Sequence, residues 1–208
     1  MMTIVYKLGN ALYLNITNAC PCSCVFCIRN LTDGVGSAAS LWLEHEPSLD
    51  EIKTAIDAHR PFSGIDEIVF CGFGEPMERA DIVIAVSEYI KSFNSSFFIG
   101  QEKPAQVRLN TNGLVFLMWP GFDVSRLAVI DAVSISLNAD DPAEYLRLTQ
   151  SKFGEGSFDS MLAFAREAMK YTSVVFSVVD GNLSDDRLIN CQKIAGEIGV
   201  PLRVRGRE

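Results

Sequence analysis

The sequence predicts an α/β protein in which a parallel sheet curves into a partial (β/α)6 barrel, a TIM-like arrangement. Two observations predict this fold: short apolar runs alternate with longer segments of helical period, and six such runs occur along the chain. Because 208 residues with 48% hydrophobic content are enough for one well-buried core, we expect a single domain spanning residues 1–208.

The apolar runs predict strands, and the periodic segments between them predict helices. The expected strands are 11–17, 67–74, 105–112, 132–139, 173–180 and 202–207. The expected helices are 48–59, 77–93, 123–130, 157–171 and 184–199. The first helix has the clearest start, because Ser48 stands at the N-cap position and Glu51 completes a capping box.

Polar and glycine-rich segments follow the first four expected strands. A cysteine cluster follows the first, GFGEP (72–76) ends the second, NTNG (110–113) ends the third and SLNADD (136–141) ends the fourth. Because parallel sheets collect active sites beyond the carboxyl ends of their strands, we expect these segments to converge on one face. The connection 28–47 is long, which is typical of either a functional lid or a disordered loop.

Charge and composition argue against several classes of protein. A net charge of −8 and a pI near 4.8 disfavour direct nucleic-acid binding. No apolar run approaches the ~18 residues of a membrane span. The first ten residues show neither a basic nor an apolar signal-peptide region, and six cysteines are too few for a disulfide scaffold. We therefore expect a cytoplasmic protein whose reduced thiols serve metal or redox chemistry.

The cysteine cluster is the strongest chemical signal. Thiolates are soft ligands for iron-sulfur clusters, zinc or copper(I). A zinc site would need a second ligand pair from residues that form no metal-ligand spacing: Cys71, Cys191, His45 and His59. Cys20, Cys24 and Cys27 instead give C-x-x-x-C-x-x-C, which leaves one iron of a four-iron cubane without a protein ligand and open for binding.

This pattern resembles the radical S-adenosylmethionine (SAM) superfamily, whose signature C-x-x-x-C-x-aromatic-C follows the first strand of a partial (β/α)6 barrel. Phe26 fills the aromatic place, and GFGEP resembles the family's Gly-Gly-Glu-Pro motif with Phe73 in place of the second glycine. NTNG and SLN stand where the family places further SAM contacts. CPCSCVFCIR, SLWLEHEP and PLRVRGRE look most like the TatD-associated radical SAM proteins.

The resemblance implies an enzyme. Cys20, Cys24 and Cys27 would bind a 4Fe-4S cluster whose fourth iron is chelated by SAM, and electron donation would cleave SAM to a 5′-deoxyadenosyl radical that abstracts hydrogen from substrate. The substrate is an unidentified small molecule or peptide. A flavodoxin or ferredoxin is the generic electron donor, and the family name suggests a functional association with a TatD-type nuclease.

The resemblance also assigns cofactor contacts. Phe26 belongs to the signature itself. The methionyl amine falls to Gly72, Phe73, Gly74 and Glu75, and other parts of SAM to Asn110, Asn112, Ser136 and Asn138. Simpler interpretations are a strand-to-helix turn starting at Pro76, a tight Asn-Gly turn, and helix caps at Asn138 and Asp140.

Several residues have open roles. Cys22 is expected to project differently from its neighbours and not to be a ligand, although a substrate-thiol or fourth-ligand role is possible. Arg29 is a candidate charged lip of the site, and His45 a candidate catalytic residue in the long connection. The last strand carries Arg203, Arg205 and Arg207 on one face, which is either a solvated outer face or an inward set for an anion. Cys71 and Cys191 are expected to pack as small apolar residues.

A nuclease accessory module is suggested only by the family name, and the acidic charge balance argues against direct DNA binding. Three other functions also compete. A 7-carboxy-7-deazaguanine synthase is another compact radical SAM enzyme, but that family places a hydroxyl residue close after the last cluster cysteine, where this chain has Ile28 and Arg29. A glycyl-radical activating enzyme would need a protein partner that nothing in the sequence identifies. From a different class, a non-catalytic iron-sulfur electron carrier would use all four thiols and leave no open iron.

Overall fold

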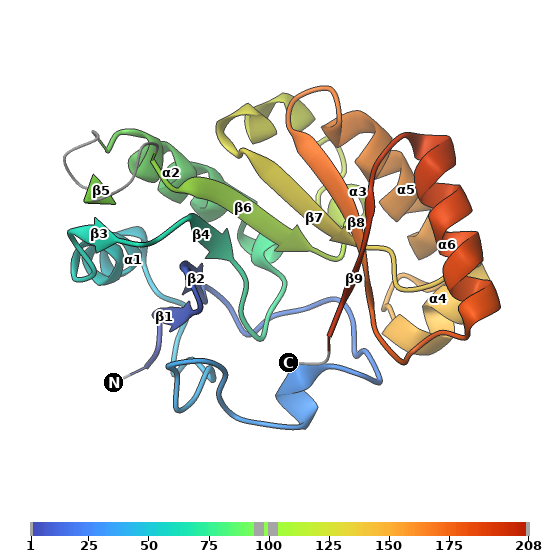
Figure 1. The fold of residues 1–208 in the computed structure, drawn as a ribbon, viewed down its shortest axis with the longest axis horizontal. Coiled ribbons are helices and arrows are strands. Elements are labelled where there is room, and N and C mark those ends of the chain that lie inside the picture. Colours follow the sequence, from blue (N-terminus) through green and yellow to red (C-terminus); the bar gives the residue numbers. More distant parts are fainter. Residues whose placement is uncertain (1, 94–97, 100–103, 207–208) are drawn as a thin grey trace.

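A curved seven-stranded sheet forms the centre of the molecule (Figure 1). The computed structural model describes residues 2–93, 98–99 and 104–206. The strand order is β1-β2-β4-β6-β7-β8-β9, and β3 pairs with β5 in a separate two-stranded sheet. The strands are β1 (Val5–Leu8), β2 (Ala11–Leu14), β3 (Phe62–Ser63), β4 (Glu67–Phe70), β5 (Phe98–Ile99), β6 (Gln106–Thr111), β7 (Ala132–Ser136), β8 (Ser173–Val179) and β9 (Leu202–Arg205).

The six expected strands are confirmed as β2, β4, β6, β7, β8 and β9, paired in parallel in chain order. This agrees with the partial barrel predicted from sequence. Each strand ends at or before the limit of its apolar run, because the polar and glycine-rich residues at its carboxyl end leave the sheet as loops. β4, for example, ends at Phe70, and the sequence from Cys71 to Gly74 lies outside it.

An additional strand, β1, was not predicted. It pairs antiparallel with β2, and Tyr6 lies opposite Tyr13 with their rings stacked 5.2 Å apart. Gly9 and Asn10 join the two strands, and Gly9 has a φ of +58°. A Gly-Asn pair between two apolar runs is a recognised hairpin signal, so the sequence did contain the information.

Helices cover one side of the sheet, as α2, α5 and α6 show in Figure 1. The α-helices are α1 (Leu49–Asp57), α2 (Ala80–Lys91), α3 (Val115–Met118), α4 (Pro142–Thr149), α5 (Ser157–Ala168) and α6 (Asp185–Ile198), and the 3-10 segments are η1 (Ile28–Asn30), η2 (Pro76–Arg79), η4 (Val124–Val129) and η5 (Gly154–Gly156). The capping box of α1 is confirmed: Ser48 N donates to Glu51 Oε2 at 2.8 Å, and Glu51 N donates to Ser48 Oγ at 3.3 Å. None of the helices in the described ranges is long and apolar enough to cross a membrane.

One predicted helix needs correction, and the short helices α3 and α4 were not among those expected. The segment expected as a helix at 123–130 is the 3-10 segment η4, which begins after Asp123 caps Ser125 N. α4 was not among the expected helices, although its start carries good signals. Asp141 Oδ1 accepts from Glu144 N at 2.8 Å, and Pro142 occupies the first helical position.

The sheet has two different faces. Toward the helices it presents the main hydrophobic core, including Ile68, Phe70, Leu109, Val133 and Phe176. The alternate residues of the same strands form the concave face. In register across the sheet, this face carries Val69, Arg108, Asn110, Ser134, Ser136 and Ser177. Polar side chains thus line the inside of the partial barrel.

The long connection 28–47 is packed in place, so the alternative of a disordered loop is wrong. Leu41 and Leu43 are buried, and their carbonyl groups accept from Asn15 Nδ2 and Asn18 Nδ2, each at 2.8 Å. A second, smaller hydrophobic cluster joins this connection to the sheet through Tyr6, Leu41 and Phe73.

Candidate active site

The cysteine loop passes the carboxyl ends of the strands (Figure 1). Backbone hydrogen bonds hold it against the end of α4: Ser23 N donates to Thr149 O and Val25 N to Leu148 O, both at 3.0 Å. Lys152 N donates to Pro21 O at 2.9 Å. The unpredicted helix α4 is therefore the support on which the predicted cysteine loop rests.

The thiols of Cys20, Cys22 and Cys24 lie near one another, and Cys22 differs from the three predicted ligands in its burial. Cys20, Cys24 and Cys27 are half-buried, whereas Cys22 is only 3% exposed. The thiol of Cys22 makes hydrogen bonds with the side chains of Cys20 and Cys24. Asn112 Nδ2 lies 3.9 Å from Cys22 Sγ.

These contacts separate the acidities of the thiols. Hydrogen bonds to Cys20 and Cys24, together with burial, raise the pKa of Cys22. The same bonds lower the pKa of Cys20 and that of Cys24. Burial raises the pKa of Cys27. Cys20 and Cys24 are the members of the group that most readily become thiolates, the form that binds metal.

Arg29 lies beside the cysteines, as expected for a charged lip. Its Nη2 is 3.4 Å from Cys22 O, a long hydrogen bond. Its positive charge acts to lower the pKa of Cys20, Cys24 and Cys27. Arg29 therefore favours the thiolate form in all three.

Glu75 joins the cysteine loop to two strand ends. Its Oε1 accepts from Met77 N at 3.0 Å and from Thr111 Oγ1 at 2.7 Å, and its Oε2 accepts from Asn112 N at 2.7 Å. Its own N–H donates to Ala19 O at 2.8 Å. Burial raises the pKa of this carboxyl to about 7 in spite of these three donors. Because a carboxylate has about four acceptor positions, one is left for a ligand.

The glycines of GFGEP are required by the chain's own packing. A Cβ on Gly72 would lie 2.1 Å from Asn15 Oδ1, and one on Gly74 would lie 2.3 Å from Thr17 O. The sequence predicted that a ligand would approach these glycines closely. Instead, the segment that leads into the cysteine loop lies against them. Gly72 and Gly74 let that segment lie against the end of β4.

Phe73 fits for a related reason. Its side chain is 3% exposed and points into the small cluster with Tyr6 and Leu41, and its ring meets that of Trp42 edge-on at 5.0 Å. Only its backbone can contribute to a ligand site. A large residue at this family glycine position is therefore explained by the connection 28–47, which it anchors.

The two asparagines of NTNG differ in their surroundings. Asn112 is near the cysteines: besides its contact with Cys22, its Oδ1 accepts from Leu114 N at 2.9 Å. Asn110 faces the concave side, where its Oδ1 accepts from Arg108 Nη1 at 2.8 Å and its side chain hydrogen-bonds the thiol of Cys71. Arg108 is in turn held by Glu67 through two hydrogen bonds of 3.1 and 2.8 Å.

The end of β7 offers an unsatisfied acceptor. Ser136 is the last residue of the strand and lies on the concave face opposite Ser177. Asn138 follows in a left-handed conformation, with a φ of +57°, and is 5% exposed. Its Oδ1 is buried and has no hydrogen-bond partner among the described residues. A buried orphan acceptor at a strand end matches a site made for a polar ligand.

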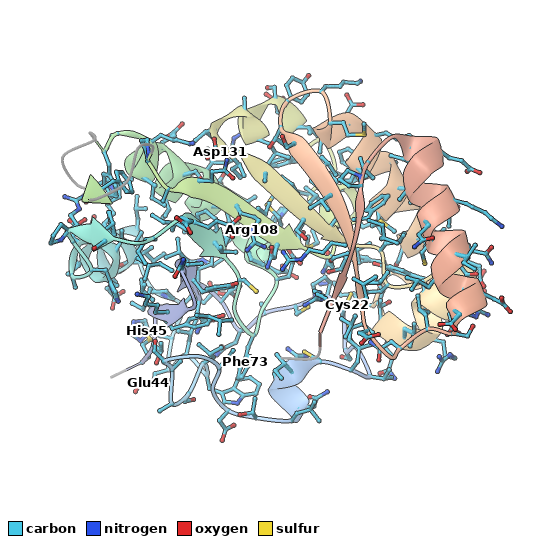
Figure 2. The ribbon with its side chains drawn as sticks, viewed as in Figure 1. Cys22, Glu44, His45, Phe73, Arg108 and Asp131 are labelled. Atoms are coloured by element: carbon cyan, nitrogen blue, oxygen red, sulfur yellow. The ribbon has the colours of Figure 1, made fainter. Side chains whose placement is uncertain are left out.

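Two other candidates lie differently from their expectations. His45 is exposed and pairs with Glu51 at 3.0 Å, next to the capping box of α1. Figure 2 shows it well apart from Cys22. Cys71 is not part of either hydrophobic cluster; it lies at the polar concave side, contrary to the expectation of apolar packing. Cys191 is fully buried in the main core, as expected.

Phe26 and the C-terminal arginines are the remaining residues that the sequence analysis singled out. Phe26 is partly buried and packs against the main core. Arg203 and Arg205 lie on β9 and are exposed, and Arg207 is outside the described residues.

A shallow groove elsewhere does not belong to this site. It has a volume of about 770 Å³ and is lined by residues such as Ile130, Thr172 and Pro201, which precede β7, β8 and β9. The groove is therefore at the amino ends of the strands. Chemistry in parallel sheets belongs to the carboxyl ends, where the cysteines lie.

The donor set fits an iron-sulfur cluster. The described residues include no group of three or more His, Cys, Asp or Glu side chains that could hold a single metal ion. A cubane does not need its protein ligands to meet at one point, because each thiolate binds a different iron atom. Cys20, Cys24 and Cys27 supply three soft ligands from one loop, and Glu75 and Asn138 offer acceptors at the neighbouring strand ends.

The fold and site together define an α/β-barrel protein whose strand ends surround a thiol-rich loop. The chain belongs to the radical SAM superfamily, whose model matches residues 14–191. Membership of this superfamily makes the protein an enzyme with a 4Fe-4S cluster and SAM as cofactors. No match was found among the curated proteins.

Solved structures share the fold at low sequence identity. Streptococcus suis SuiB bound to its precursor peptide SuiA superposes with a TM-score of 0.63 at 15% identity, over 97% of this chain and 40% of SuiB. SuiB bound to S-adenosylmethionine gives 0.59 at 17% identity, over 96% and 41%. TYW1 with a lysine-pyruvate adduct gives 0.61 at 14% identity, over 97% and 66%. The chain thus spans less than two thirds of each of these proteins.

Proposed function

We propose that Cys20, Cys24 and Cys27 hold the 4Fe-4S cluster and that the enzyme uses it to abstract a hydrogen atom from an unidentified small molecule or peptide. One observation carries this proposal: the three-cysteine loop lies at the carboxyl ends of parallel strands, next to the buried carboxylate of Glu75. When bound, the cluster and SAM supply an electron and a 5′-deoxyadenosyl radical.

The chain's own residues bind and orient these groups. Arg29 favours the thiolates that ligate iron. The free acceptor position of Glu75 would receive an N–H of the methionyl amino group, and the ionised carboxyl would accept it most strongly. Asn138 Oδ1, which has no hydrogen-bond partner among the described residues, would accept a hydrogen bond from a ribose hydroxyl.

We also propose the narrower assignments that the sequence suggests. CPCSCVFCIR and SLWLEHEP support membership of the TatD-associated group, and hence a functional association with a TatD-type nuclease. The unpaired thiols support a cytoplasmic protein, with a flavodoxin or ferredoxin as electron donor. The seven-stranded sheet, which joins strands from both ends of the chain, supports one domain over residues 1–208. SuiB was solved with a peptide substrate, which supports a peptide as one candidate substrate here.

The test is formation of 5′-deoxyadenosine. The protein is purified without oxygen, reconstituted with iron and sulfide, reduced with dithionite and given SAM. Wild type is expected to form the product, and Cys24→Ala is expected to lose both the cluster and the product. A wild-type protein that holds a cluster yet gives no 5′-deoxyadenosine would contradict the proposal.

Cys22 is the informative second variant, because its thiol contacts those of Cys20 and Cys24. If three thiolates suffice, Cys22→Ala keeps its iron content, its cluster absorbance and its 5′-deoxyadenosine. Loss of the cluster in Cys22→Ala would instead assign four thiolates to the cluster. SAM would then have no open iron.

A further inference from the structure

We propose that Arg203 and Arg205 of β9 bind an anionic group of the substrate, a carboxylate or a phosphate, on the concave face of the sheet. This inference rests on the proposed function, because it takes the concave face at the strand ends as the place where substrate meets cofactor. It also decides between the two interpretations that the sequence left open for these arginines.

The register of β9 shows which face the arginines occupy. Arg203 pairs with Ser177 of β8, and Arg205 pairs with Val179. On β8 the intervening residues Phe176 and Val178 belong to the main core on the helix side. Partners in register share a face, so Arg203 and Arg205 lie on the concave face.

The same register shows the level at which they lie. Ser136 of β7 pairs with Ser177, which pairs with Arg203, so these three residues form one row. Arg205 lies one row closer to the carboxyl ends. Both arginines are thus at the end of the sheet where the cysteine loop, Glu75 and Asn138 gather.

Electrostatic coupling agrees with this placement. The charge of Arg205 acts to lower the pKa of Cys71, although burial raises that pKa overall. Cys71 follows β4, and three strands lie between β4 and β9 in the sheet order. The charge of Arg205 therefore affects the pKa of a thiol on the other side of the barrel interior.

Neither arginine has an acidic partner among the described residues, as is also true of Arg29 and Arg166. Six of the ten described arginines form ion pairs: Arg60–Asp57, Arg79–Glu46, Arg108–Glu67, Arg126–Asp81, Arg147–Glu144 and Arg187–Asp141. Arg203 and Arg205 form no ion pair with a described residue. The chain has 26 acidic residues for 18 lysines and arginines, so free carboxylates are abundant. Two exposed guanidinium groups on the concave face without an acidic partner among the described residues are suited to an anion from outside the chain.

The geometry of the guanidinium groups indicates which anions they bind. Each offers a planar set of donors that matches the two oxygens of a carboxylate or phosphate. Residues two apart on a strand are separated by roughly 7 Å. The pair can therefore hold one doubly charged group between them or two separate anionic groups of one substrate.

The experiment measures anion binding to the reconstituted holoprotein by anaerobic calorimetry. The probes are inorganic phosphate and succinate, each tested with SAM present, and SAM affinity is measured separately. Arg203→Gln and Arg205→Gln are compared with Arg166→Gln, an exposed arginine of α5 that has no ion pair with a described residue and loses the same charge. Circular dichroism and cluster absorbance establish that each variant is folded and loaded, and Arg205→Lys tests rescue by charge alone.

We expect wild type and Arg166→Gln to bind one of the probes with equal affinity, and Arg203→Gln and Arg205→Gln to bind it about tenfold or more weakly, with SAM affinity unchanged. Tighter binding of phosphate than of succinate would indicate a phosphate group on the substrate, and the reverse would indicate a carboxylate. Equal binding by Arg166→Gln and Arg205→Gln, or no binding by wild type, would overturn the inference. So would a loss of SAM affinity without a loss of anion binding, since the arginines would then serve the cofactor.

The failure of this inference and that of the proposed function are distinguishable. A protein that forms 5′-deoxyadenosine while its anion binding is indifferent to Arg203 and Arg205 contradicts only the inference. A protein that binds an anion through these arginines but forms no 5′-deoxyadenosine contradicts only the proposed function.

Discussion

The two faces of the central sheet are built from alternate residues of the same strands, yet they are opposite in character. Toward the helices, Ile68, Phe70 and Leu109 are fully buried among apolar side chains. On the concave face, Arg108 and Ser177 are also buried, but each is polar. The comparison shows that burial alone does not distinguish stability from chemistry in this protein. The two faces differ in whether their buried atoms are polar and so need hydrogen-bond partners.

The largest expected effect comes from the helix-facing side. Phe164 of α5 is fully buried and meets Phe116 edge-on at 5.7 Å. Phe164→Ala should lower the free energy of unfolding by about 3–5 kcal/mol, because it removes buried contacts and leaves a cavity. Urea unfolding measures this loss. At temperatures where the variant is folded, its SAM affinity should match wild type.

Ser134→Ala is the matched change on the concave face, where Ser134 is 8% exposed. It should alter stability by about 1 kcal/mol or less. Equal losses from Phe164→Ala and Ser134→Ala would contradict the division of roles between the faces.

Glu75 allows the two faces to be compared through the pH dependence of the free energy of unfolding. Burial raises its pKa to about 7 from an ordinary value of 4.5, so the folded protein binds the proton more tightly than the unfolded chain. Its contribution to stability is complete below pH 4.5 and is lost as the pH rises through 7. The loss is on the order of 3 kcal/mol.

Unfolding curves at pH 5 and pH 8 for wild type and Glu75→Gln test this prediction. Wild type should lose stability relative to the variant between the two pH values. SAM affinity should move in the opposite direction, rising with pH in wild type alone, because the ionised carboxyl is the stronger acceptor for an N–H of the methionyl amino group. Parallel curves for the two proteins would show that the pKa of Glu75 is not raised.

A smaller effect is expected where the long connection meets the sheet. Trp42 is 42% exposed, and its ring contacts Phe73 edge-on. Trp42→Ala should cost about 1 kcal/mol, the usual contribution of such an aromatic pair. Limited proteolysis should become faster within 28–47 while the cluster absorbance is unaffected. Cleavage at the wild-type rate would mean that Leu41 and Leu43 hold the connection without Trp42.

The smallest effect is predicted for His45, which lies away from the cysteines and contacts Glu51 at the surface (Figure 2). His45→Ala should form 5′-deoxyadenosine at the wild-type rate and bind SAM equally well. A clear fall in product, with cluster content unchanged, would restore His45 as a catalytic candidate and extend the site beyond the concave face.

Much of the fold and of the candidate site follows from local sequence. The six parallel strands are readable because each apolar run is bounded by turn residues, and the start of α1 because Ser48 and Glu51 form a capping box. The cysteine spacing and GFGEP carry their chemistry in the residue types themselves. These features depend on neighbours a few positions apart in the chain, so no tertiary knowledge is needed to recognise them.

Other features depend on contacts between distant segments, which only the tertiary structure decided. Phe73 is explained by Trp42 and Leu41, some 30 positions earlier, and the cysteine loop is supported by Thr149 at the end of α4. The register between β8 and β9 determined which face Arg205 occupies. A shift of one residue would have put it on the other face, and the alternation along one strand cannot reveal that register.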